Sequence, residues 1–81
     1  MRWLRFQEKL HSGEADANLR FDELIGYLVQ LGFAVRLRGS HHVLSHPGVP
    51  DILTLQRDGA RCKTYQVRQV RKLLAQHKLR L

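Results

Sequence analysis

Two adjacent histidines follow a Gly-Ser pair in an arginine-rich stretch, Arg36-Leu37-Arg38-Gly39-Ser40-His41-His42. An unperturbed histidine has a pKa of about 6.5 and exchanges protons near neutral pH, and arginine binds phosphate well. These residue types suit acid–base cleavage of RNA without a metal ion. In that reaction a base takes the proton of a 2′-hydroxyl, and cations stabilise the charge that develops on the phosphate. The alternative is a histidine that closes the turn or contacts phosphate without catalysis.

Other kinds of chemistry fit these histidines less well. Successive side chains of a strand point to opposite faces, so His41 and His42 should point apart. His42 and His46 share a face, but four strand residues separate them by about 13 Å, whereas two ligands of one metal ion lie about 4 Å apart. We therefore expect no metal centre and no cofactor. Ser40 beside His41 has no evident acidic partner, which argues against a serine nucleophile.

The charge of the chain is concentrated near one end. The 81 residues carry a net charge of +7, and residues 1–56 are neutral, with six basic and six acidic side chains. Residues 57–81 hold eight basic side chains and one acidic side chain, Asp58. A localised basic field favours a polyanionic partner such as nucleic acid, an acidic protein or an anionic surface, and a solvated basic helix is the alternative. A chain of this length forms one domain, 1–81, so its site should lie on a surface or in a shallow groove.

The single cysteine and the apolar pattern indicate where the protein works. One cysteine, Cys62, excludes an intrachain disulfide and fits a reducing compartment. Arg61 and Lys63 flank it in a predicted loop and could lower the pKa of its thiol, although we expect no role for it. The first residues lack the apolar run of a signal peptide. No stretch approaches the roughly 18 apolar residues that cross a membrane. We expect a soluble, cytoplasmic protein.

Three segments have the apolar spacing of amphipathic helices. They are residues 2–11, 21–31 and 64–77. Gly26 lies inside the second and costs roughly 1 kcal/mol relative to alanine, which tertiary packing must offset. Thr64 is a good N-cap for the third helix. A polar connection over 14–18 separates the first helix from the second.

Three further segments are predicted to be short strands joined by tight turns. They are residues 33–38, 41–45 and 52–55. Gly39-Ser40 forms the first turn and Pro47-Gly48 ends the second strand. Residues 57–63 are predicted to be a polar loop. The three strands should form an antiparallel meander.

The order helix, helix, three strands, helix predicts an α+β fold. Helices should cover one face of a three-stranded antiparallel sheet in a sandwich of two layers. Residues 1–18 would be an N-terminal helical extension of a core over 20–79. The helix–strand–strand–strand–helix order of that core is the order of the double-stranded RNA-binding domain.

Several blocks of the chain, in order, resemble the HicA toxins, the small ribonuclease partners of HicB antitoxins. The blocks are Leu31-Gly32-Phe33, Arg36 to Val43, Leu53 to Gln56, Gly59, Lys63 to Arg71 and Lys78-Leu79. The resemblance covers about residues 20–79. It implies a toxin of a type II toxin–antitoxin system that cleaves mRNA as a metal-independent endoribonuclease. It also implies a HicB-type antitoxin that forms a hetero-oligomeric complex with the toxin and covers its active site.

The resemblance also assigns roles to residues. The histidine of the Gly-Ser-His turn, which would be catalytic, corresponds to His41. We expect further residues to bind the RNA, namely Arg36, Arg38, Gly39, Ser40, His42, Lys63, Arg68, Arg71 and Lys72. Many HicA proteins carry Pro-x-His after the third strand, where this chain has Gln56-Arg57-Asp58. That difference leaves open whether this chain cleaves RNA as efficiently as those relatives.

Two other functions remain compatible with the residues. One is a non-catalytic RNA-binding module that contacts phosphates and reads the shape of the helix. The other is a protein-interaction domain whose basic helix docks on an acidic partner. All three functions depend on charge, so only turnover of RNA separates the enzyme from its two alternatives.

Overall fold

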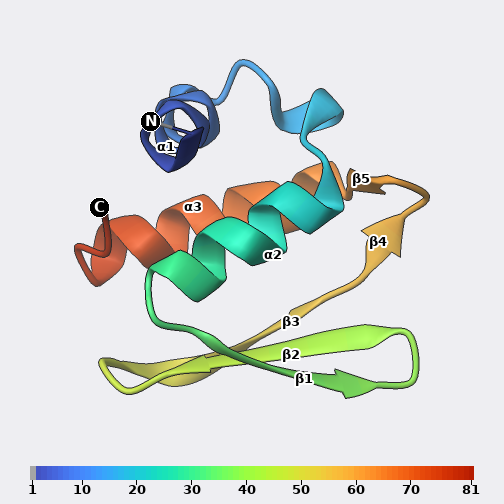
Figure 1. Cartoon of the computed structure of the whole chain (residues 1–81), viewed down its shortest axis with the longest axis vertical. Coiled ribbons are helices and arrows are strands. Elements are labelled where there is room, and N and C mark those ends of the chain that lie inside the picture. Colours follow the sequence, from blue (N-terminus) through green and yellow to red (C-terminus); the bar gives the residue numbers. More distant parts are fainter. Residues whose placement is uncertain (1) are drawn as a thin grey trace.

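The computed structural model describes residues 2–81 and has three layers (Figure 1). Helices α2 and α3 form the middle layer, with a three-stranded sheet on one side and α1 on the other. The helical elements are α1 (Arg2–Ser12), the 3₁₀ turn η1 (Asp16–Asn18), α2 (Phe21–Gln30) and α3 (Thr64–Gln76). The strands are β1 (Ala34–Arg38), β2 (His41–His46), β3 (Val49–Leu55), β4 (Arg57–Asp58) and β5 (Arg61–Cys62). The predicted α+β fold is confirmed, and α1 adds a third layer to the two that the sequence predicted.

The sheet is an antiparallel meander in the order β1-β2-β3. Gly39 and Ser40 form the two-residue turn between β1 and β2, and Gly39 has a φ of +60°, a conformation that glycine adopts without strain. The turn sets the register, in which Arg38 lies opposite His41 and Leu37 lies opposite His42.

β3 begins earlier than the sequence predicted, because His46 closes the preceding turn. Its Nδ1 accepts the Gly48 N–H at 2.9 Å, and its Nε2 lies 2.9 Å from the Leu31 carbonyl oxygen at the end of α2. The strand therefore starts at Val49 rather than at residue 52. Pro50 is tolerated in it because β3 is an edge strand.

The core lies between the sheet and the middle helices and continues beneath α1 through Phe6 and Leu10. Leu44, Leu53 and Leu55 of the sheet are buried in one cluster with apolar side chains of α2 and α3. These leucines alternate with exposed side chains along β2 and β3, so one face of the sheet is covered and the other faces solvent.

α1 packs closely on the middle layer. The Tyr27 hydroxyl is fully buried and donates to Gln7 Oε1 at 2.6 Å. The Trp3 ring lies over Gly26, where a Cβ atom would come within 2.6 Å of Trp3 Cη2. The glycine inside α2 thus makes room for an aromatic ring from α1, which is the packing that the sequence left unspecified.

The predicted polar connection over 14–18 contains a buried acid. Asp16 opens η1, and both its carboxylate oxygens accept from the Arg71 guanidinium, at 2.8 and 2.9 Å. The same guanidinium donates to the Leu10 carbonyl at 3.0 Å. The Arg71 bond holds the pKa of Asp16 below its ordinary value, because it favours the ionised carboxylate. This contact ties α1, η1 and α3 together.

Residues 57–63 are not the polar loop that the sequence predicted. β4 and β5 form a small hairpin around Gly59, whose φ is +60°. Backbone bonds from Phe21 N–H to the Ala60 oxygen and from Cys62 N–H to the Leu19 oxygen attach the hairpin to the start of α2. Backbone hydrogen bonds to residues before and within α2 hold this hairpin in place. Its side chains are mostly polar, so the sequence pattern did not predict two strands here.

Two local predictions in this region are wrong. Cys62 is buried, and burial raises the pKa of its thiol to about 11, so the neighbouring Arg61 and Lys63 do not activate it. Thr64 is the first residue of α3 rather than its N-cap, which is Lys63, and in the described part of the chain the Lys63 side chain makes no capping hydrogen bond. No helix within residues 2–81 has the length and apolar character needed to span a membrane.

Candidate functional site

The β1–β2 turn lies at the same end of the molecule as the β4–β5 hairpin and the first turns of α2 and α3 (Figure 1). Three segments that are distant from the Gly39-Ser40 turn in the sequence therefore lie at the same end of the molecule as the turn. The residues that the sequence analysis assigned to chemistry, His41 and His42, directly follow this turn.

His41 lies on the open face of the sheet. It is exposed and lies opposite Arg38, while Arg36 occupies the same face two residues away along β1. Both arginines are exposed, and neither forms an ion pair within residues 2–81. The three side chains place an imidazole beside two cations on this face.

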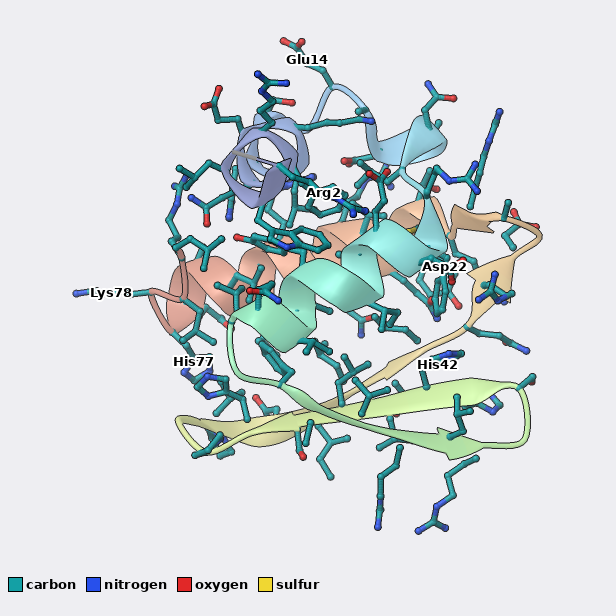
Figure 2. The ribbon with its side chains drawn as sticks, viewed as in Figure 1. Arg2, Glu14, Asp22, His42, His77 and Lys78 are labelled. Atoms are coloured by element: carbon teal, nitrogen blue, oxygen red, sulfur yellow. The ribbon has the colours of Figure 1, made fainter. Side chains whose placement is uncertain are left out.

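His42 points the opposite way, as the strand alternation predicted. Figure 2 shows His42 between the sheet and the start of α2, near Asp22. The edge of its ring contacts the Phe21 ring, with 4.8 Å between the centroids and 75° between the planes. Its Nδ1 is buried and has no hydrogen-bond partner within residues 2–81. The ring is thus held by packing, and no hydrogen bond from these residues fixes which nitrogen carries the proton.

The Phe21 ring also carries a cation. Arg57 Cζ lies 4.8 Å from the ring centroid, and Arg57 donates to Asp22 Oδ1 at 2.8 Å. Arg57 is one of the residues that stand in place of the Pro-x-His of many HicA proteins. Its positive charge therefore lies over the same ring that holds His42, and Asp22 partly neutralises it.

Gln56 joins the Gly-Ser turn to α3. Its Nε2 donates to Ser40 Oγ at 2.9 Å, and its Oε1 accepts from Lys63 Nζ at 3.1 Å. Its backbone N–H donates at 3.0 Å to Oε1 of the buried Gln66, whose Nε2 lies 3.4 Å from the Tyr65 hydroxyl. The polar atoms of one glutamine thus fix the position of Ser40 and of the first turn of α3.

The basic residues expected in α3 separate into two groups. Arg68 and Lys72 are exposed on the outer side of the helix, although Arg68 Nε also lies 4.0 Å from Asp16. Arg71 is turned inward and bonded to Asp16 and Leu10. Its guanidinium therefore has a structural role, whereas Arg68 and Lys72 remain on the surface.

Sequence reasoning missed Phe21, Gln66, Arg57 and Tyr65 at this end of the molecule. Phe21 has the spacing of an ordinary core residue, and Gln66 that of a polar position on a helix. Their proximity to the turn depends on how α2 and α3 cross the sheet, and no local pattern encodes that arrangement.

Comparison with known proteins identifies the family. A family model described as the HicA toxin of bacterial toxin–antitoxin systems matches residues 21–79. A search of curated proteins and a search of solved structures each found no match. The matched stretch runs from the first residue of α2 to beyond the end of α3, and it leaves α1 outside.

Proposed function

This chain belongs to the HicA family of toxins of bacterial toxin–antitoxin systems, and from that premise we propose that it is an endoribonuclease that cleaves mRNA without a metal ion. A HicB-type antitoxin would neutralise it, and the cytoplasm would be its place of action. The observation that carries the proposal is the Gly39-Ser40 turn, which puts an exposed histidine opposite one free arginine and near a second.

The proposed reaction uses the RNA's own 2′-hydroxyl as nucleophile. A histidine nitrogen takes the 2′ proton while the 2′ oxygen attacks the adjacent phosphorus. The bond from phosphorus to the 5′ oxygen of the next nucleotide breaks, and that oxygen takes a proton from the protonated histidine or from water. The products are a 2′,3′-cyclic phosphate and a free 5′-hydroxyl. In-line attack needs a flexible backbone, which favours a single-stranded substrate.

Arginines stabilise the charge that builds up on the phosphate oxygens. Arg36 and Arg38 are the cations of the His41 face. Gly39 and Ser40 form an exposed turn without bulky side chains, so the RNA backbone can approach it closely. Lys63, Arg68 and Lys72 would hold the flanking phosphates along the start and outer side of α3.

An acid–base histidine needs access to the substrate and a fixed orientation, and each ring of the pair has one of these two properties. His41 has access to solvent and the nearby cations, and the family resemblance assigns the reaction to it. His42 has the fixed orientation, because its ring packs against Phe21, and catalytic groups are usually held by such contacts. We therefore propose His41 as the acid–base group and test His42 beside it.

The test incubates end-labelled mRNA in EDTA with the wild type and with His41→Ala and His42→Ala. His41→Ala should lower the cleavage rate at least about a hundredfold, the usual contribution of general acid–base catalysis. Loss with His42→Ala alone would move the catalytic role to His42. Far-UV circular dichroism checks that each variant is folded.

Two results would replace the proposal with its alternatives. RNA that is retarded in a gel but intact with the wild type would indicate a binding module without catalysis. RNA that is neither cut nor retarded would indicate a domain that acts only on a protein partner. Addition of a purified HicB-type antitoxin should abolish cleavage by the wild type, and continued cleavage would exclude it as the inhibitor.

A further inference from the structure

Tyr65 differs from the other large aromatic side chains of this protein. The chain has six Phe, Tyr and Trp residues, and the other five are buried or half-buried. Tyr65 is 60% exposed in the first turn of α3. Within residues 2–81, no aromatic ring or cation stacks on it. Both the apolar area and the π-face of this ring are therefore available to a partner.

The position of Tyr65 connects it to the candidate active site. Its hydroxyl lies 3.4 Å from Nε2 of Gln66, and Gln66 Oε1 accepts from the Gln56 backbone N–H at 3.0 Å. Gln56 in turn donates to Ser40 in the turn before His41. The first turn of α3 is therefore held in a fixed position relative to the Gly-Ser-His turn.

Basic residues lie on the same part of the chain as Tyr65. Lys63 immediately precedes α3, and Arg68 and Lys72 follow Tyr65 by three and seven residues, the spacing of one exposed helix face. An exposed aromatic ring among Lys and Arg side chains is the arrangement with which proteins bind single-stranded nucleic acid. The ring stacks on a base while the cations bind the backbone.

We propose that Tyr65 is a stacking platform for one unpaired base of the RNA that enters the Gly-Ser-His turn. The inference rests on the proposed function and adds to it a contact with one base of the substrate. The platform requires a single strand, because the bases of an A-form duplex are stacked on one another and shielded from a protein ring.

The experiment measures binding separately from cleavage. A fluorescently labelled, fully 2′-O-methylated single-stranded decamer lacks the nucleophile and stays intact, so anisotropy gives its Kd. Tyr65→Ala should raise this Kd about tenfold, the scale of one lost base–aromatic stack. Tyr65→Phe should stay within about twofold of the wild type, because it keeps the ring and loses only the hydroxyl.

Two controls distinguish stacking from charge and from general damage. Lys63→Ala should flatten the dependence of log Kd on log salt, whereas Tyr65→Ala should leave that slope unchanged. Ile52→Ala, which removes another exposed apolar side chain on β3, should not change the Kd. A decamer with abasic sites throughout should bind the wild type and Tyr65→Ala equally.

Four outcomes would overturn the inference. If Tyr65→Ala binds the decamer as tightly as the wild type while the wild type still cleaves mRNA, the proposed function stands and the platform does not exist. If Tyr65→Phe is as weak as Tyr65→Ala, the hydroxyl rather than the ring makes the contact. If Tyr65→Ala weakens only the complex with an acidic antitoxin, the ring belongs to a protein interface. A wild type that binds no RNA would remove the proposed function and this inference together.

Discussion

At the scale of single residues, the site depends on side chains that no motif contains. Gln56 stands where many HicA proteins have Pro-x-His, and the sequence alone left its consequence open. In the structure its side chain bridges Ser40 and Lys63. Asp58 stands at the histidine position of Pro-x-His, and Gln56, at the proline position, therefore contributes to the geometry of the turn through hydrogen bonds. On the proposed mechanism it is a positioning residue.

Replacing Gln56 with alanine should lower cleavage about tenfold, because one lost hydrogen bond of about 1 kcal/mol frees the turn and another frees Lys63. The melting temperature should change little, since the backbone N–H of residue 56 still donates to Gln66. Gln56→Glu should keep the Lys63 contact, and its carboxylate should accept a hydrogen bond from the Ser40 hydroxyl, so its rate should stay closer to that of the wild type. The rates of the two variants, compared with Thr54→Ala on the exposed face of the same strand, show whether these two contacts support the turn. A wild-type rate for Gln56→Ala would show that the turn needs no such support.

At the scale of elements, the sequence pattern predicted those helices and strands whose formation depends on neighbouring residues. Amphipathic spacing located all three helices, and alternation with Gly39-Ser40 located the hairpin that carries the histidines. The β4–β5 hairpin was not predicted because backbone hydrogen bonds to Leu19 and Phe21 hold it in place. Such bonds do not depend on the type of side chain, so the sequence pattern does not reveal them. Arg71 was assigned to RNA for a similar reason, because its partner Asp16 is 55 residues away in the sequence.

Gly26 shows how one element constrains another. In an isolated helix, Gly26→Ala would stabilise by roughly 1 kcal/mol. Here the added methyl group collides with Trp3, so the variant should be destabilised by about 1–3 kcal/mol. In a Trp3→Ala background the same change should become neutral or stabilising. Urea unfolding of the four proteins gives the comparison, and the same effect in both backgrounds would refute the contact.

The Asp16–Arg71 pair makes the stability of the layered helices depend on pH. The folded pKa of Asp16 is depressed, so its contribution is present above the unfolded pKa of about 4 and is lost as the pH falls through the folded value. Asp16→Asn should cost on the order of 2 kcal/mol at pH 7. The difference from the wild type should shrink near pH 3. Urea unfolding at both pH values tests this, and a difference independent of pH would assign the loss to packing.

At the scale of the whole molecule, the candidate site and the supporting helix α1 lie on different sides of the helical layer. The candidate site lies at the end where the sheet, the small hairpin and the starts of α2 and α3 meet, and α1 covers the far side of the helical layer (Figure 1). The basic side chains of residues 57–81 are divided between the surface of the candidate site and the contacts that hold the fold together. Lys63, Arg68 and Lys72 remain available to a polyanion, whereas Arg71 fastens α1 and η1 to the core. Net charge alone therefore overstates the surface open to RNA.

This arrangement makes α1 part of the cooperative fold rather than an appendage, although the family model begins only at residue 21. Trp3 is the only tryptophan and lies in α1 against Gly26, so its fluorescence reports on α1 alone. Far-UV circular dichroism reports on all the helices and strands. Because α1 buries Phe6, Leu10 and the Tyr27 hydroxyl, the two signals should follow one unfolding curve in urea. Phe6→Ala should shift both midpoints together, by about 3–5 kcal/mol in stability, whereas Leu4→Ala on the exposed side should shift neither. A fluorescence transition that precedes the dichroism transition would mean that α1 detaches before the core unfolds, and the site would then be supported by residues 19–81 alone.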